Sequence, residues 1–294
     1  MNDFIPYIST SINDTLRSLS FFYPEVILVI GFVIVILADL FVSKRSPQAP
    51  FLSAIVTLVV TALLNYQMLG QSPLFKLIFS FISILFVLFV RYHKPLQNSS
   101  KGTGDLFNIL LAIQLGLNLM VMSQNLLMIY LSLEMVSVGS YLMVGYLSQS
   151  PKQSEAAMKY ALFGAVCSAF MLYGMSLLYG FTGSLEINSP QFVSFLGTMP
   201  FHSWGIGLIM LLIGIAFKLS IVPFHFWAPD VYDGAPTVFT SFMATIVKAA
   251  GFIAFIRLFA YAFGTMLDQW QILITVIIAA TLLIGNLTAV FQQS

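Results

Sequence analysis

Three charged residues, Glu134, Lys218 and Lys248, lie near the middle of apolar segments that are long enough to cross a lipid bilayer. A charged side chain at the bilayer centre costs about 2.5 to 3.5 kcal/mol on insertion scales. Such residues therefore usually face a protein interior, where they line a path for protons, ions or substrate. Their types and positions predict a site of proton or ion transfer inside the membrane.

The glutamate belongs to a polar stripe on an otherwise apolar helix. Tyr130, Glu134, Ser137 and Tyr141 follow i, i+4, i+7, i+11 spacing, which places them on one helical face. A buried carboxylate needs a cation or a hydrogen-bond donor opposite it. One interpretation is a purely structural hydrogen bond between helices. We favour a functional role for Glu134, because carboxylates inside membranes usually mark transport paths.

Lys218 is followed by Pro223 in the string GIAFKLSIVPFHFWAPD. Proline cannot donate a backbone hydrogen bond to the carbonyl of Leu219, so we expect the helix to break one turn after the lysine. Irregular backbone at membrane depth persists only inside protein or beside a wet cavity, and transporters build ion sites at such breaks. His225, just past the break, is either a proton relay or a structural donor beside Trp227.

Two further lysines are candidates. Lys248 shares a face with Ser241 and Thr245, and it lies about eleven residues from either end of its segment, too deep to reach an interface at 1.5 Å per residue. Lys159 follows Glu155 by four residues, the favourable order for a helical ion pair. Lys159 is therefore either a structural partner near the membrane surface or a member of the same site.

Other charged residues lie near the ends of apolar segments, where long side chains reach the polar interface. We expect interfacial anchoring for Glu25, Asp39, Lys76 and Arg257. The only cysteine is Cys167, so the chain can form no internal disulfide and offers no thiolate cluster for zinc or iron and sulfur. We expect neither a metal nor a redox cofactor in this chain.

Composition defines the elements that must position these residues. Hydrophobic residues make up 59% of the 294, only 8% are charged, and the mean hydropathy is +0.94, which predicts an all-α, multi-pass membrane bundle. A net charge of +1 gives no basic surface for nucleic acid, so the lipid bilayer is the expected partner. Nine membrane-spanning segments are predicted, at 24–43, 51–70, 74–92, 105–123, 125–147, 154–180, 202–223, 237–261 and 268–291.

Basic residues predict the orientation of these segments. Alternate loops carry Lys44, Arg45, Arg91, Lys94, Lys101 and Lys152. The opposite loops contain Glu186 and Asp268 and almost no basic residue. By the positive-inside rule, the N-terminus is expected outside and the C-terminus of this sequence inside.

Four strings carry a family resemblance. They are SLEMVSVGSYLMVGY (132–146), SEAAMKYALFGAVCSAFMLYGMSLLYG (154–180), GIAFKLSIVPFHFWAPDVYDGAPT (214–237) and VKAAGF (247–252). Together they resemble the antiporter-like membrane subunits of respiratory complex I, the proton-pumping NADH:quinone oxidoreductase, and its subunit N (chain 2) in particular. The string WAPDVYDGAPT is the most specific, because subunits L and M and the Mrp-type antiporters generally vary it.

The resemblance implies roles for the charged residues. It implies that Glu134 pairs with Lys218, that Lys248 passes protons along a central polar axis, and that Lys159 is the basic residue of the AAMKY motif. It also implies a proton-translocating subunit of a bacterial inner-membrane enzyme, beside other antiporter-like and small membrane subunits. NAD, flavin, iron-sulfur clusters and quinone would then be bound by partner subunits. Two alternatives stay open, an Mrp-type cation/proton antiporter and a noncatalytic membrane scaffold.

The resemblance further implies a division of the chain. Family members contain two inverted five-helix repeats within about fourteen helices, and this sequence matches the first repeat and little more than one further helix. We expect three N-terminal membrane helices in 1–103, one antiporter-like repeat with a broken seventh helix in 104–262, and the start of a second repeat in 263–294. The sequence is accordingly expected to be a piece of a longer protein.

Overall fold

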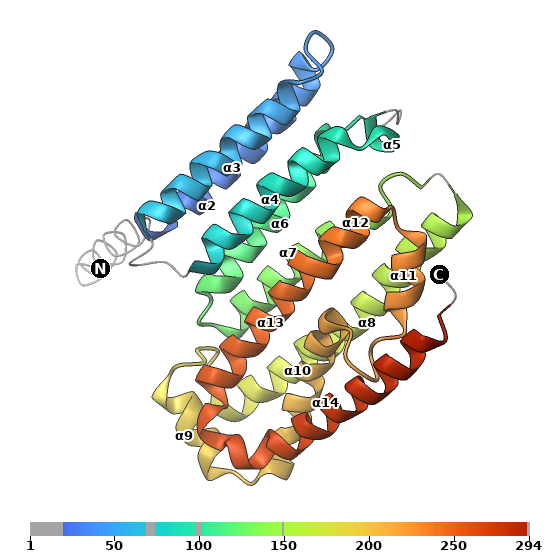
Figure 1. Cartoon of the computed structure of the whole chain (residues 1–294). Helices are drawn as coiled ribbons and strands as arrows, with labels where there is room; N and C mark the ends of the chain where they lie inside the picture. Colours follow the sequence, from blue (N-terminus) through green and yellow to red (C-terminus); the bar gives the residue numbers. More distant parts are fainter. Residues whose placement is uncertain (1–19, 69–73, 98–101, 149, 293–294) are drawn as a thin grey trace, which may run out of the picture.

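The computed structural model describes residues 20–68, 74–97, 102–148 and 150–292, and it confirms the predicted all-α bundle (Figure 1). Within these ranges, nine helical segments are long and apolar enough to cross a membrane. The main helices are α2 (Tyr23–Leu37), α3 (Ala49–Gln67), α4 (Leu74–Tyr92), α6 (Gly104–Met122), α7 (Leu126–Val144), α8 (Pro151–Thr182), α10 (Phe201–Leu219), α12 (Thr237–Phe242), α13 (Lys248–Arg257) and α14 (Leu267–Val290). Shorter helices are α5 (Lys94–Gln97), α9 (Pro190–Thr198) and α11 (Trp227–Gly234).

Several helices begin where the sequence provides a capping side chain. The side chains of Asn125, Ser150 and Ser189 accept hydrogen bonds from the first turns of α7, α8 and α9. Prolines occupy the first turns of α8 and α9, where the missing N–H has no helical partner to lose. The predicted spans agree with the helices to within a few residues, except that 202–223 extends past the end of α10 at Leu219.

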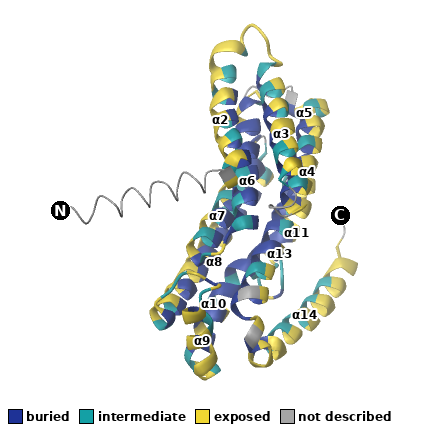
Figure 2. Ribbon diagram, turned by 90° about the vertical axis from the view of Figure 1, so that its left-hand side faces the viewer, coloured by how far each residue is buried: buried dark blue, intermediate teal, exposed yellow. Residues whose placement is uncertain are grey.

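The helices pack as one continuous bundle. α2, α3 and α4 lie beside α6, which in turn packs against α7, and α8 lies between α7 and α10 (Figure 1). Buried residues concentrate on α6, α10 and α13, whereas α14 is largely exposed along its length (Figure 2). Because α2 packs closely on α6, contacts cross the boundary predicted at residue 103, and the division into three parts stays a prediction.

The connections with basic residues gather at one end of the bundle. The turn between α2 and α3, the short helix α5 and the start of α8 lie toward the same end in Figure 1. This arrangement is the one that the alternation of basic loops requires, although Lys101 lies outside the described residues. Which membrane face this end occupies stays a prediction from the positive-inside rule.

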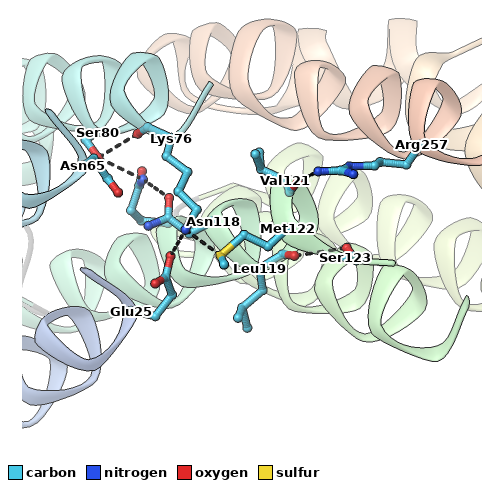
Figure 3. A network of polar contacts seen from close by, with 11 residues as sticks. Glu25, Asn65, Lys76, Ser80, Asn118, Leu119, Val121, Met122, Ser123 and Arg257 are labelled. Atoms are coloured by element: carbon cyan, nitrogen blue, oxygen red, sulfur yellow. Dashed lines mark hydrogen bonds and ion pairs between the residues drawn. The ribbon is translucent and has the colours of Figure 1, made fainter. Parts of the chain in front are cut away.

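The expected interfacial anchoring of Glu25 and Lys76 is wrong. Both side chains are buried, at 4% and 0% exposure, and Lys76 Nζ lies 2.7 Å from Glu25 Oε1 (Figure 3). Arg257 also turns inward, because its guanidinium donates to the backbone carbonyl of Val121 on α6. Position near a helix end predicted an interfacial location for each residue, and partners distant in the sequence override that tendency.

Candidate functional site

Lys218 lies in the last turn of α10 and is buried among aromatic side chains, with 5% of its surface exposed. Its ammonium approaches the hydroxyl of Tyr141 at 3.5 Å. It also lies 4.9 Å from the ring centre of Tyr141, 5.5 Å from that of Tyr160 and 5.3 Å from that of Phe217. Aromatic faces attract cations, so these rings stabilise a lysine that has left water.

The predicted helix break occurs directly after this lysine. α10 ends at Leu219, whose carbonyl Pro223 would crowd if the helix continued, and Ser220 adopts a left-handed conformation with φ of 56°. The carbonyl of Phe217 accepts a hydrogen bond from the buried indole N–H of Trp227, at 3.1 Å. The break therefore places a polar backbone group beside Lys218 and ties it to the start of α11.

Glu134 faces α8 from the middle of α7. The hydroxyl of Ser168 donates to Glu134 Oε1 at 2.7 Å and lies 3.1 Å from the hydroxyl of Tyr130. The predicted polar stripe is thus partly confirmed, because Tyr130 and Glu134 share one partner. Ser137, by contrast, donates to the backbone carbonyl of Leu133 within its own helix.

Glu134 and Lys218 line the same small cavity. Its volume is about 10 Å³, and its polar wall consists of Glu134, Tyr141, Ser168 and Lys218. A cavity of this size holds about one water molecule, which needs two to four polar partners. The implied direct ion pair between Glu134 and Lys218 is not among those found in the described residues. The two charges instead share a space in which one water can join them.

Lys248 lies on the neighbouring helix, immediately after a π-helical turn at Met243–Val247. Its ammonium lies 5.7 Å from the ring centre of Tyr232, on α11. One turn later, a Cβ placed on Gly251 would lie 3.2 Å from Lys218 Cβ, so the absence of a side chain there lets α13 approach α10 at the lysine. The two lysines therefore belong to adjoining surfaces of packed helices.

The hydroxyl groups of Ser241 and Thr245, predicted to share a face with Lys248, bond to the backbone of their own helical segment instead. Ser241 donates to the carbonyl of Thr237, and Thr245 donates to the carbonyl of Ser241, each within the same helical segment. Both side chains are exposed. A π-helical turn has more residues than an α-helical turn, and one lies directly before Lys248. Residues at i, i+4 and i+7 therefore no longer share one face of this helix.

Lys159 forms the predicted ion pair with Glu155, at 2.8 Å, and a second one with Asp230 of α11, at 2.6 Å. Lys152 and Asp233 make a parallel link between α8 and α11 at 2.6 Å. These pairs hold α11 against α8, next to the broken end of α10. The structure therefore places Lys159 in a surface network beside the site, apart from the cavity that Lys218 lines.

His225 lines a large open cavity at the broken end of α10. The cavity has a volume of about 670 Å³, and its wall includes Ser220, Asp230, Tyr232 and residues of α14. The Nδ1 atom of His225 is buried and has no hydrogen-bond partner within the described part of the chain. Since Ser220 lies two residues after Lys218, the cavity brings a polar space close to the buried lysine.

Sequence reasoning missed the partners that come from other helices. Ser168, Tyr160 and Asp230 contact the predicted residues but lie outside every spacing pattern that singled those residues out. The sequence held one indication of a close contact, the glycine at position 164 of α8. In the structure, a Cβ on Gly164 would lie 1.9 Å from the Tyr141 hydroxyl oxygen. In the described residues, no three His, Cys, Asp or Glu side chains gather in a way that could hold a metal.

The position of Lys159 gives a prediction. Replacing Lys159 with methionine removes two exposed ion pairs, which solvent largely screens, and leaves the Lys218 cavity intact. If these lysines carry protons, as the sequence predicts, we expect transport to fall by much less than it does when Lys218 is replaced. The measurement is the rate of proton transfer across the membrane by the protein with its natural partners. A loss equal to that of a Lys218 variant would show that Lys159 lies on the proton path itself.

The fold and the site together define a class, that of multi-pass membrane proteins with a lysine buried beside a broken helix. The family described as "NADH:quinone oxidoreductase/Mrp antiporter, TM" matches residues 123–294. The chain belongs to this family of antiporter-like membrane subunits. It is 35% identical to NADH-quinone oxidoreductase subunit N 2 of Sorangium cellulosum over 96% of its own length and 62% of that relative.

Solved structures share the fold. A chain of respiratory complex I from Thermus thermophilus with bound aureothin superposes with a TM-score of 0.74 and 29% identity, over 92% of this chain and 58% of that one. A chain of the Mrp complex from Dietzia sp. gives a TM-score of 0.72 over 92% of this chain and 54% of that one. At 18% identity, the match to the Mrp chain shows a shared fold and nothing more. The chain spans about 60% of the length of the curated relative it matches.

Proposed function

We propose that this chain translocates protons across the membrane as a subunit of a quinone-reducing complex. The observation that carries the proposal is the shared cavity in which Glu134 and the buried Lys218 face each other, beside the break in α10. Burial disfavours the charged form of a lysine, and a nearby carboxylate favours it. Lys218 is then the residue that holds the proton, and Glu134 controls how firmly it is held.

The energies of the two steps are comparable. Two unit charges about 5 Å apart interact by about 3 kcal/mol at an effective dielectric constant near 20. Moving one proton against about 150 mV requires about 3.5 kcal/mol, at 2.3 kcal/mol per 100 mV. A movement of Glu134 toward or away from Lys218 therefore changes the proton's free energy by the amount that transport requires.

The proposed route enters through the open cavity that His225 lines and reaches Lys218 past the broken end of α10. From Lys218, the proton moves to Lys248 on the adjoining helix. The approach of α13 at Gly251 and the π-helical turn before Lys248 support this step, because they bring the two lysines to one helix interface.

The complex supplies the driving chemistry in this proposal. Nicotinamide, flavin, iron-sulfur clusters and quinone would be bound by partner subunits, and other antiporter-like and small membrane subunits would flank this chain. The relatives are named as subunits of NADH-quinone oxidoreductases of bacteria, which supports this assignment and a location in the bacterial inner membrane. The N-terminus would lie outside and the C-terminus of this sequence inside.

An Mrp-type cation/proton antiporter is the alternative with a specific observation in its favour, the fold shared with the Mrp complex. We favour the quinone-reducing complex, because the 35% identity to a subunit N is far higher than the 18% identity to the Mrp chain. Purifying the chain with its natural partners separates the two. Copurification with redox subunits supports our proposal, and a complex of antiporter subunits alone contradicts it.

Replacing Glu134 with glutamine tests the proposal against a noncatalytic scaffold. Glutamine keeps an oxygen that can accept from Ser168 but removes the charge. We expect normal assembly with a loss of most proton translocation through this subunit, measured as protons moved per electron in proteoliposomes. Asp268→Asn, which removes an exposed carboxylate at the start of α14, is the control. A scaffold predicts the opposite result, poor assembly and normal pumping once assembled.

A further inference from the structure

A second group of buried polar residues lies on α2, α3, α4 and α6 (Figure 3). None of these residues lines the cavity of Lys218. The centre of this group is the ion pair of Glu25 and Lys76, in which Lys76 Nζ also contacts the sulfur of Met122 at 2.6 Å. Removing two charges from water costs several kcal/mol per ion, and apolar residues of similar size often serve a fold as well. Packing alone therefore does not explain why an ion pair is buried here.

A column of polar side chains continues from this pair toward the membrane centre. Ser80 and Ser83 follow Lys76 at i+4 and i+7 on α4, and Gln114 and Asn118 precede Met122 at four-residue intervals on α6. Gln114 donates to Asn118 at 3.0 Å and accepts from Ser83 at 2.7 Å. All four side chains are fully buried.

Asn65 joins the column from α3 by donating to Ser80 at 3.2 Å. Ser83 lies nine residues into α4, which corresponds to about 14 Å at 1.5 Å per residue. The hydrocarbon core is about 30 Å thick, so the column reaches about halfway across the membrane.

Three atoms of this group have no hydrogen-bond partner among the residues that the structure describes. They are Oε2 of Glu25, Oδ1 of Asn65 and Nδ2 of Asn118. Each belongs to a side chain that is at least nine-tenths buried. Buried polar atoms in proteins are nearly always hydrogen-bonded, and water supplies the bond where protein groups do not. A chain of water molecules could bond to these three atoms, because the column offers them a carboxylate, an amide oxygen that accepts and an amide nitrogen that donates.

A partly polar cavity has Met122 in its wall. It has a volume of about 230 Å³, and its polar wall includes Ser123, Gln124, Asn125, Glu186 and Asn188. Met122 lines this cavity with part of its surface, while its sulfur contacts the buried ammonium of Lys76. Methionine is a flexible, unbranched side chain, so it can move aside more easily than a branched or aromatic residue. It separates the cavity from the ion pair.

We propose that Glu25 and Lys76 form a second proton site, which is reached from this cavity past Met122 and is continued to the membrane centre by water held along α3, α4 and α6. A proton passes from water in the cavity to the Glu25 carboxylate and then to water in the column. Only O–H bonds form and break, and Lys76 keeps the carboxylate ionised between transfers. The site gives this chain a path at the membrane face where α2 and α4 begin.

Thiol reactivity tests whether the column is reached by water. The assembled complex carries Cys167→Ser, Met122→Ala and either Ser83→Cys in the column or Phe81→Cys, whose native side chain is 60% exposed on the outer surface. The probe is 2-aminoethyl methanethiosulfonate, which reacts with the thiolate that forms in water. We expect Ser83→Cys to react at least about tenfold faster, the effect of one pKa unit on the thiolate fraction. Reaction no faster than at Phe81→Cys overturns the proposal.

A transport measurement tests whether protons use this path. Unlike the thiol experiment, it rests on the function proposed for the chain. The double variant Glu25→Leu with Lys76→Met removes both charges together and keeps apolar volume, so we expect it to assemble. We expect fewer protons moved per electron, and an unchanged ratio overturns the proposal. If the variant does not assemble, the thiol experiment decides, since it keeps both Glu25 and Lys76. Failure of a Lys218 variant to lower the ratio would instead contradict the function proposed for the chain.

Discussion

Replacing Lys218 with methionine is expected to abolish most proton translocation through this subunit while the complex still assembles. The side chain is 5% exposed and packed against Tyr141, Tyr160 and Phe217. Methionine has a similar length and packs well against aromatic rings, so the loss is one of charge and proton binding. The measurement is the number of protons moved per electron in proteoliposomes that contain the assembled complex.

A second variant separates proton binding from positive charge. Lys218→Arg keeps the charge, but a guanidinium does not release its proton in a protein. If Lys218 holds and releases protons, arginine fails as methionine does. If the site needs only a fixed positive charge, arginine restores transport and the proposed role is wrong.

A surface lysine provides the matched control for both variants. Lys152 lies on α8, with a side chain that is 61% exposed and paired with Asp233. Lys152→Met makes the same chemical change away from the cavity, and we expect the proton-to-electron ratio to stay at its normal value. An equal loss in Lys152→Met and Lys218→Met would indicate a general effect of lost charge on the complex.

The fold was predictable to the extent that it depends on local sequence. Runs of apolar residues predicted the nine spans, and Pro223 predicted the break that ends α10 near Leu219. The error of a few residues at that end has a physical cause. The proline disrupts the turn before it rather than at its own position, so the helix ends at the carbonyl that its ring would crowd if the helix continued.

The site was predictable only in part, because its contacts join helices that are distant in the sequence. Charge in an apolar segment identified Glu134 and Lys218, and helical spacing placed Tyr141 on the face of Glu134. Nothing in these helices shows that Ser168 of α8 completes the cavity. The same limit explains the error at Glu25 and Lys76. These residues are 51 positions apart, and each one alone has the position of an interfacial anchor.

The glycine opposite Tyr141 allows the cavity between Glu134 and Lys218 to form. A Cβ on Gly164 would lie 1.9 Å from the Tyr141 hydroxyl oxygen and 2.5 Å from the ring carbon that bears it. The end of a tyrosine ring cannot yield over such distances without rotation of the whole side chain. Tyr141 would then lose its place beside the ammonium of Lys218, where it supplies both a hydroxyl at 3.5 Å and an aromatic face.

We therefore expect Gly164→Ala to lower the proton-to-electron ratio nearly as much as Lys218→Met, although it adds a single methyl group and no charge. Gly180→Ala is the matched control on the same helix, since a Cβ there has no neighbour within 4 Å. Both variants gain helix propensity, which rules out a loss of helix stability as the cause. If Gly164→Ala assembles and pumps normally, Tyr141 has no part in holding the proton, and the cavity as described is not the site of transfer.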